Sequence, residues 1–305
     1  MNPFLSVVIV VYKSEKHIGP CLDALEQSND IGERLEVLVV DNETEGIRNR
    51  QRQLVVKHSD LVIRYIPNDR NGGYGQGNNL GIRLSTAPVV LIMNPDVRLT
   101  GTSPGRICDA FDRDGKLALL GMRQMLGNGL RGRSFLWASG LPTSLPGSAL
   151  LWLSNRLGWF FPRWECIQGS CFALRKSAFE SIGMFDESVF MYGEERDIHG
   201  RLRKLRNVRI ACDWGMSYQH LTDRRGFSFD ATVKSLEVSA HWCRKNGIPE
   251  NVFWRKMHRH LRMLLLWNRI RHMHGNAKSV EFLEKLKVFV FSRWHNTLDG
   301  NGTEP

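Results

Sequence analysis

The stretch LSVVIVVY, from Leu5 to Tyr12, indicates the fold class of the chain. Its residues are nearly all apolar and many are β-branched, as expected for a central strand that is covered on both faces. Similar runs follow at Leu35–Val40, Val62–Ile66 and Pro88–Met93, with helical patterns between them. Strands that alternate with helices predict parallel βαβ units, so we expect an α/β fold with a mostly parallel sheet.

Acidic residues lie at the ends of two of these predicted strands. Asp41 ends the second strand, and Asp96 follows the fourth in the turn Asn94-Pro95-Asp96. Open α/β sheets bind ligands at the carboxyl ends of their strands, so we expect both carboxylates at one edge of the sheet. A carboxylate there suits a hard cation such as Mg²⁺ or Mn²⁺ that bridges to phosphates. The structural alternative for either residue is an Asx turn.

The segment Asn71–Asn79 (NGGYGQGNN) is dense in glycine. A loop of this composition lets backbone amides and a helix N-terminus approach a phosphate. A tight turn that binds no ligand is the alternative. A dinucleotide-binding fingerprint would have to follow the first strand, where Tyr12-Lys13-Ser14-Glu15 stands instead, so this position excludes it.

A predicted helix over Glu194–Leu205 begins with two carboxylates, those of Glu194 and Glu195. Acidic residues in a first turn often serve only as partners of the helix dipole. The apolar and aromatic residues of Met184–Tyr192 precede this pair. Such surroundings would raise the pKa of a carboxyl group and suit it to act as a general base.

Three later segments carry weaker signals. Residues 168–175 indicate a strand, and His220 follows a predicted short strand over Val208–Asp213 as either a metal ligand or a structural histidine. The segment Gly127–Glu165 is rich in Gly, Pro, Ser and Trp and predicts a long loop or an inserted hairpin. Within it, Trp152–Trp164 is suited to shape an acceptor site, to contact lipid or to pack in a core.

The net charge of +11 is concentrated in the last third of the chain. Residues 1–195 contain 21 Lys and Arg against 21 Asp and Glu, whereas residues 196–305 contain 21 against 10. The stretch Arg255–Arg271 alternates basic with apolar residues, which predicts an amphipathic helix that either lies on an anionic leaflet or packs its apolar face on the protein. We expect one domain over 1–238 and a basic, aromatic helical extension over 239–305.

The sequence also indicates a compartment. Six scattered cysteines form no CxxC pair, which favours buried, reduced thiols and the cytoplasmic side of the membrane. The first residues lack the features of a signal peptide, and no run reaches the roughly 18–20 apolar residues that a bilayer span needs. We therefore expect a cytoplasmic protein that contacts the inner face of the cell membrane peripherally.

Taken in order, these segments resemble the family 2 inverting glycosyltransferases of the GT-A fold, and among them the bacterial rhamnosyltransferase-like enzymes that build O-antigen and related surface polysaccharides. The resemblance runs from about Leu5 to Ser228. It rests on SVVIVVY, VVDN, GGYGQGNNLGI, MNPDV, GSCFALRKSAFESIGMFDESVFMYGEERDI and the later His220. It implies a dTDP- or UDP-sugar donor, a lipid-linked or oligosaccharide acceptor, and a divalent metal, Mg²⁺ or Mn²⁺.

The resemblance also implies roles on the donor side. Asp41 would bind the nucleotide base or its ribose. Asp96 would stand for the last Asp of the metal-binding DxD element, although Asn94 replaces its first carboxylate, and His220 would be a further metal or diphosphate ligand. The remaining residues of this side would lie along the nucleotide: Gly73, Gly75, Asn78 and Asn79.

On the acceptor side, Glu195 falls where the family usually has the catalytic Asp, so it would be the general base, with Glu194 as the second choice. It would deprotonate an acceptor hydroxyl that attacks the anomeric carbon opposite the leaving diphosphate, which inverts the configuration.

Two other classes of protein would fit part of the pattern. A sugar nucleotidyltransferase would release pyrophosphate from a nucleoside triphosphate and would not need a base such as Glu195. A non-catalytic protein that binds nucleic acid or membrane through its basic tail would leave the strand-end motifs unexplained. We therefore expect no nucleic-acid partner.

Overall fold

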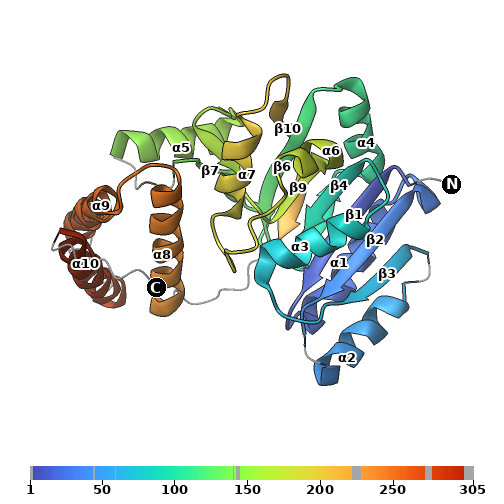
Figure 1. Cartoon of the computed structure of the whole chain (residues 1–305), viewed down its shortest axis with the longest axis horizontal. Coiled ribbons are helices and arrows are strands. Elements are labelled where there is room, and N and C mark those ends of the chain that lie inside the picture. Colours follow the sequence, from blue (N-terminus) through green and yellow to red (C-terminus); the bar gives the residue numbers. More distant parts are fainter. Residues whose placement is uncertain are drawn as a thin grey trace. The chain divides into compact units, whose positions relative to one another are not determined.

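The structure is a computed structural model that describes residues 3–43, 45–58, 60–139, 141, 145–221, 228–271 and 277–298. The chain forms two units (Figure 1). Unit 1 comprises Met1–Ala138 and Leu153–Asp223, and unit 2 comprises Ser139–Trp152 and Arg224–Pro305. The domain limits expected from the sequence, 1–238 and 239–305, stay a prediction.

Unit 1 is built on an eight-stranded sheet with the strand order β3-β2-β1-β4-β9-β6-β10-β5. Strands β3, β2, β1 and β4 run parallel to one another, β9 is antiparallel to both of its neighbours, and β10 is parallel to β6 but antiparallel to β5. The strands are β1 (Leu5–Val11), β2 (Leu35–Asp41), β3 (Val62–Pro67), β4 (Val89–Met93), β5 (Val97–Gly101), β6 (Leu117–Leu126), β9 (Cys171–Arg175) and β10 (Arg209–His220). The α/β class with a mostly parallel sheet is thus confirmed.

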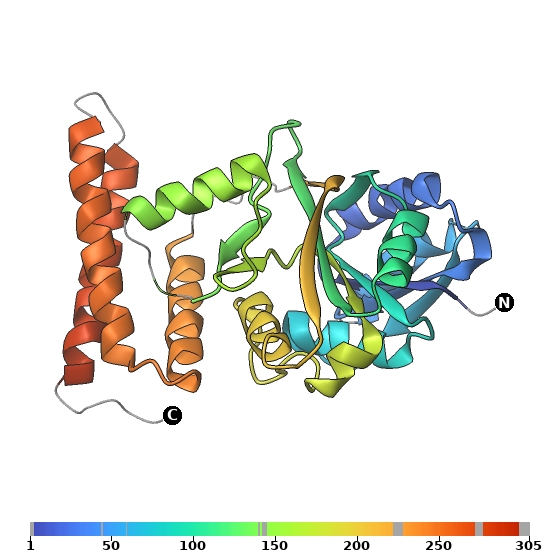
Figure 2. The same ribbon diagram turned by 90° about the horizontal axis from the view of Figure 1, so that it is seen from above.

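Helices cover both faces of this sheet, and Figure 2 shows them on its two sides. One face packs against α1 (Glu15–Ser28), α2 (Glu45–Val56) and α4 (Pro104–Arg113), and the other against α3 (Gly73–Leu84), α6 (Lys176–Ser181) and α7 (Glu194–Leu202). A 3-10 turn, Gly32–Arg34, leads into β2.

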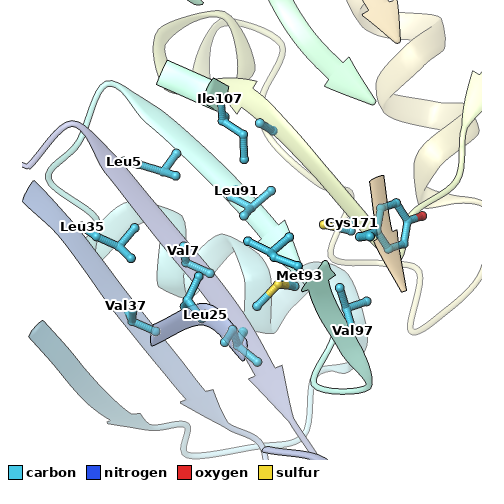
Figure 3. Close-up of a cluster of buried hydrophobic side chains, with 14 of the residues drawn as sticks. Leu5, Val7, Leu25, Leu35, Val37, Leu91, Met93, Val97, Ile107 and Cys171 are labelled. Atoms are coloured by element: carbon cyan, nitrogen blue, oxygen red, sulfur yellow. The ribbon is translucent and has the colours of Figure 1, made fainter. Parts of the chain in front are cut away.

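Successive residues of β1 alternate between the two cores. Leu5 and Val7 point into the first core together with Leu25 of α1 (Figure 3), whereas Val8 belongs to the second core. This burial on both faces explains why the strand contains almost no polar residue.

The segment expected to be a loop or hairpin, Gly127–Glu165, is more regular than its composition indicates. It contains a helix, α5 (Leu145–Leu157), and a short strand, β7 (Phe135–Trp137), that pairs with β8 (Glu165–Ile167). The expectation of a hairpin was right only for β7 and β8, and the helix was missed. Pro146 and Gly147 obscure the start of α5, although a first helical turn tolerates proline.

Unit 2 contains the helices α8 (Phe229–Lys245), α9 (Glu250–Arg271) and α10 (Ala277–Leu298), seen together in Figure 1. Their shared core buries Cys243, Phe253, Trp254, Leu261 and Val290. The apolar face of the amphipathic helix expected near Arg255–Arg271 therefore packs within the protein. No helix in the described part of the chain is long and apolar enough to span a membrane.

Candidate functional site

The carboxyl end of β2 places Asp41 where the sequence predicts it. The register of β1 against β2 and β4 brings the ends of these strands to one edge. The Asp41 carboxylate is fully buried and accepts hydrogen bonds from the Glu43 backbone amide (2.8 Å) and the Tyr65 hydroxyl. Burial raises the pKa of Asp41 above its ordinary value, although these hydrogen bonds oppose the shift.

Asn42, the next residue, connects this edge to the beginning of α3. Its Nδ2 donates to the carbonyl of Gly73 (3.2 Å), and its Oδ1 accepts from Nδ2 of Asn68 (2.7 Å). Asn68 also donates to Oε1 of Gln76 on α3 (2.7 Å). Amide side chains therefore fix the first turns of α3 against the ends of β2 and β3.

The glycine-rich segment is helical rather than a loop, because α3 begins at Gly73. A Cβ on Gly81 would lie 2.5 Å from Cγ1 of Val8, and one on Gly77 would lie 2.8 Å from Cγ1 of Val10. Gly73 itself has a φ of +84° and faces the Phe190 carbonyl. The glycines of α3 thus allow close packing on β1, which explains much of the composition without a ligand.

The two asparagines of α3 differ in their contacts. Asn79 is engaged within the protein, since Nδ2 donates to the Phe185 carbonyl and to Oε1 of Glu187 (both 2.9 Å), and Oδ1 accepts from the Phe185 amide (3.0 Å). Asn78 donates to the carbonyl of Tyr74 (2.9 Å), while its buried Oδ1 has no partner among the described residues. The nucleotide contacts expected of Gly73, Gly75, Asn78 and Asn79 stay predictions.

Asp96 and His220 lie together at the other end of this edge. Asp96 is in the turn between β4 and β5, and His220 ends β10, with 3.3 Å between Nε2 of the histidine and Oδ2 of the aspartate. Burial alone would raise the pKa of Asp96, but the hydrogen bond and charge of His220 lower it below its ordinary value. The strand that carries the histidine extends to residue 220, beyond the expected limit at Asp213.

A buried chain of polar side chains supports this pair, and no motif of the sequence indicates it. The Gln124 amide lies 3.2 Å from Nδ1 of His220, and its Oε1 accepts from the Tyr218 hydroxyl (3.4 Å). The Tyr218 hydroxyl is in turn 2.8 Å from Oγ of Ser170. A hydrogen bond to one ring nitrogen of a histidine fixes which role the other can play.

Arg98 was also missed. It is buried, and its guanidinium donates to the carbonyls of Pro95 (3.1 Å), Val97 (2.7 Å) and His17 (3.2 Å). These bonds hold the Asp96 turn against α1.

The first turn of α7 places Glu194 and Glu195 in different surroundings. Glu194 is buried, its Oε1 has no partner among the described residues, and burial together with the charge of Glu195 raises its pKa to about 7. Glu195 is partly exposed. The raised pKa expected near the aromatic stretch therefore falls on the second-choice residue.

The connection between β8 and β9 joins the two halves of the site. The backbone carbonyl of Ser170 accepts from the Asn94 amide (2.9 Å), and the carbonyl of Gly169 accepts from the Tyr74 hydroxyl (2.6 Å). A Cβ on Gly169 would lie 3.7 Å from Oε2 of Glu195. The dipeptide Gly169-Ser170 therefore contacts the Asp96 turn through Asn94 and lies beside the Glu195 carboxylate of α7.

The Asp96–His220 pair is compatible with a divalent cation. Two ligands at right angles on an octahedral Mg²⁺ are about 3 Å apart, close to the observed 3.3 Å. If the Gln124 amide is turned over, its oxygen accepts a hydrogen bond from the Nδ1–H of His220, which leaves Nε2 of the histidine free to bind a metal. Two protein ligands leave the other positions to phosphate and water, as Mg²⁺ prefers.

The sequence from residue 6 to residue 183 matches the family model for Glycosyl transferase family 2. The chain belongs to this family. The expected family, and with it the GT-A fold, are confirmed. The match covers more than half of the chain and includes the β1, β2, α3 and β4 segments.

Named relatives of this family 2 protein act on sugars. It is 30% identical over 218 residues to the low-salt glycan biosynthesis hexosyltransferase Agl10 of Haloferax volcanii. The matched residues are 68% of this chain and 63% of Agl10. This chain thus spans less than two thirds of the length of Agl10. It is 29% identical over 233 residues to an N-acetylglucosaminyl-diphospho-decaprenol L-rhamnosyltransferase of Mycobacterium tuberculosis, covering 67% of this chain and 72% of that one.

Solved structures share the fold of the family 2 chain at low identity. Residues 1–349 of S. aureus TarS in complex with UDP-GlcNAc superpose with a TM-score of 0.58 at 16% identity, covering 97% of this chain and 79% of that one. The mannosyltransferase PcManGT of Pyrobaculum calidifontis, in complex with GDP-Man and Mn²⁺, superposes with a TM-score of 0.55 at 14% identity. This superposition covers 100% of this chain and 77% of PcManGT.

Proposed function

We propose that this protein is an inverting glycosyltransferase that moves a sugar from a nucleotide-sugar donor to a hydroxyl of a lipid-linked or oligosaccharide acceptor. The observation that carries the proposal is that the β8–β9 connection borders two groups of side chains with different chemistry. One group is the Asp96–His220 pair, suited to a metal and a diphosphate. The other is the pair of carboxylates at Glu194 and Glu195, one of which has a pKa near 7.

On the donor side, Asp41 would orient the nucleotide from the end of β2, and the backbone of α3 would line its path. Asp96 and His220 would hold Mg²⁺ or Mn²⁺ on the diphosphate. The bound cation would neutralise the charge that develops on the leaving group. Asp96 is suited to this because its lowered pKa keeps it ionised at neutral pH.

On the acceptor side, we assign the general base to Glu195, because it is more accessible than Glu194. Its carboxylate would take the proton of the acceptor hydroxyl as the oxygen bonds to the anomeric carbon. The bond from that carbon to the diphosphate oxygen breaks on the opposite face, so the configuration inverts. Glu194, buried behind it, remains the alternative base.

The donor and acceptor classes follow from the named relatives. A hexosyltransferase and a rhamnosyltransferase that acts on a diphospho-decaprenol lipid support dTDP-rhamnose or a UDP-sugar as donor and a lipid diphosphate saccharide as acceptor. We place the reaction in surface polysaccharide synthesis of the O-antigen kind. We place the protein at the cytoplasmic face of the membrane, which it would contact peripherally.

The test is a donor panel of dTDP-rhamnose, UDP-sugars and GDP-mannose with Mg²⁺ or Mn²⁺, scored for nucleotide release and for the anomeric configuration of the product. Asp96→Asn should reduce turnover by about 10²–10³-fold through lost metal. Glu195→Gln should reduce it by about 10²–10⁴-fold and leave donor binding intact. If Glu195→Gln keeps full activity while Glu194→Gln loses it, the base is Glu194. No turnover with any donor, retention of configuration, or pyrophosphate release from a nucleoside triphosphate would contradict the proposal.

A further inference from the structure

Four large apolar side chains of unit 1 are exposed close together in the chain. Leu153 and Leu157 lie on α5 at 37% and 44% exposure, and Trp159 and Trp164 follow in the next loop at 56% and 53%. The two leucines are four residues apart and so share a helix face. Exposed apolar groups of this size mark an interaction surface more often than isolated ones do. We call these four residues the tryptophan surface.

The loop that carries the indoles is held by specific hydrogen bonds. The buried carboxylate of Glu165 accepts from the Ser154 hydroxyl of α5 (2.5 Å) and from the Phe161 backbone amide (2.8 Å). The Trp159 amide donates to the Ser154 carbonyl (3.1 Å). The loop is therefore tied at its beginning, middle and end, and the exposure of its tryptophans results from this built conformation.

The sequence that contains the tryptophan surface is basic. Between Asp114 and Glu165 the sequence contains no acidic residue, but it contains six Lys and Arg. The exposed Arg131, Arg156 and Arg163 form no ion pair with a carboxylate in the part of the chain that the structure describes. Nη1 of Arg131 donates to the Arg156 carbonyl (2.6 Å), which joins the segment that follows β6 to α5.

We propose that the tryptophan surface, together with Arg131, Arg156 and Arg163, docks on an anionic lipid bilayer. Indole rings favour the boundary between headgroups and acyl chains, and leucines enter the apolar side of that boundary. Arginines without acidic partners bind the phosphates of anionic headgroups. A bilayer presents both layers at once, so it fits this combination better than an acidic protein does.

The proposal rests on the proposed function, because a lipid-linked acceptor has its reacting sugar at a membrane. Trp164 is five residues before Gly169, so the two Cα atoms are at most about 18 Å apart. Gly169 borders Glu195, the assigned base. Docking through this surface would therefore bring the acceptor side of the site close to the headgroups.

Unit 2 offers a rival. Phe253, Trp254 and Leu261 of α9 are buried in the core of that unit, whereas Leu266 of the same helix is 61% exposed, so α9 offers a membrane charge together with an apolar residue. A groove of about 480 Å³ is lined by Arg259, Arg262 and Lys287. A protein that bound vesicles through this groove would respond to charge substitutions in unit 2 and not to changes at the tryptophan surface.

The experiment is co-sedimentation of the full chain with pure vesicles of phosphatidylcholine, with or without phosphatidylglycerol. Trp159→Ala/Trp164→Ala should weaken binding by about tenfold or more, since each 1.4 kcal/mol of lost burial is a factor of ten. Arg156→Gln/Arg163→Gln should remove most of the preference for phosphatidylglycerol. Val56→Ala/Val62→Ala, which truncates exposed apolar residues elsewhere in unit 1, is the matched control and should bind as the wild type does.

Turnover of donor with a water-soluble acceptor separates the two proposals. The tryptophan variant should retain this turnover and lose transfer to a vesicle-borne acceptor. Unchanged vesicle binding in the tryptophan variant, or loss of binding only in Arg259→Gln/Arg262→Gln, would overturn the docking proposal and leave the proposed function standing. A wild-type chain that binds no vesicles but an acidic protein would also overturn it.

Discussion

Replacing Glu194 by glutamine should make the protein more stable at alkaline pH. The buried carboxyl of Glu194 has its pKa raised from 4.5 to about 7 by burial and by the charge of Glu195. The folded protein thus holds this proton more tightly than the unfolded chain. The stability that the neutral carboxyl allows is present below about pH 4.5 and is lost as the pH rises through about 7.

The magnitude follows from the pKa. Each unit of pKa is worth about 1.4 kcal/mol, so ionising Glu194 in the folded protein costs about 3 kcal/mol above pH 7. Glutamine has nearly the same shape and never ionises. We therefore expect Glu194→Gln to match the wild type near pH 4.5 and to be about 3 kcal/mol more stable at pH 8.5, or about 6–12 °C in Tm for a unit of this size.

The assay is urea and thermal unfolding of both proteins at several values between pH 4.5 and pH 8.5. Glu195→Gln is the matched control: it removes the neighbouring charge, so the loss of stability with rising pH should still begin near pH 4.5 but should be smaller and be complete at a lower pH. Parallel stability profiles for wild type and Glu194→Gln across this range would refute the reasoning, because they would mean that the carboxylate is not desolvated.

Two further substitutions test the packing and the polar network. Gly81→Ala should destabilise the protein by about 1–3 kcal/mol, because the added Cβ would lie 2.5 Å from Val8 Cγ1, whereas Gly19→Ala on α1 meets nothing within 4 Å and should be neutral or stabilising. Equal urea midpoints for the two would contradict this account. Gln124→Leu should raise the metal concentration needed for half-maximal donor turnover by about 10–100-fold, while Gln219→Leu on β10 should not. An unchanged metal titration would remove the role given to the Gln124 amide.

The parallel half of the sheet could be predicted because its signal is local. A strand buried on both faces, such as Leu5–Val11, needs a continuous apolar run. A helix that covers one face of a sheet needs apolar residues only along one stripe, so the two patterns differ in the sequence. A strand over residues 168–175 was also predicted and is present as β9 (Cys171–Arg175), but the antiparallel direction of β9 and the length of β10 depend on partners that are distant in sequence. The helix α5 was missed for a related reason, since its buried Ser154 and Asn155 bond to Glu165 of β8 and to the Ser134 amide outside the helix, and these polar residues weaken its apolar pattern.

The candidate site divides in the same way. Asp41 could be located because it ends a predicted strand, and Asp96 because it lies in the turn that follows one. His220 ends β10, but the predicted strand stopped at Asp213, so its place in the sheet could not be predicted. Gln124, Tyr218 and their chain of hydrogen bonds could not, since each residue is an ordinary member of a strand until the sheet brings them side by side. Composition misled the interpretation of α3, where glycine serves close packing on β1 and not only an open loop.

The β8–β9 connection explains how residues so far apart in the chain can act on one reaction. Ser170 bonds to the Asp96 turn through Asn94 and to the Gln124 chain through Tyr218, while the neighbouring Gly169 borders Glu195. Under the proposed function, a shift of this dipeptide would move the proposed metal ligands and the proposed base together, which would preserve the in-line geometry of an inverting displacement.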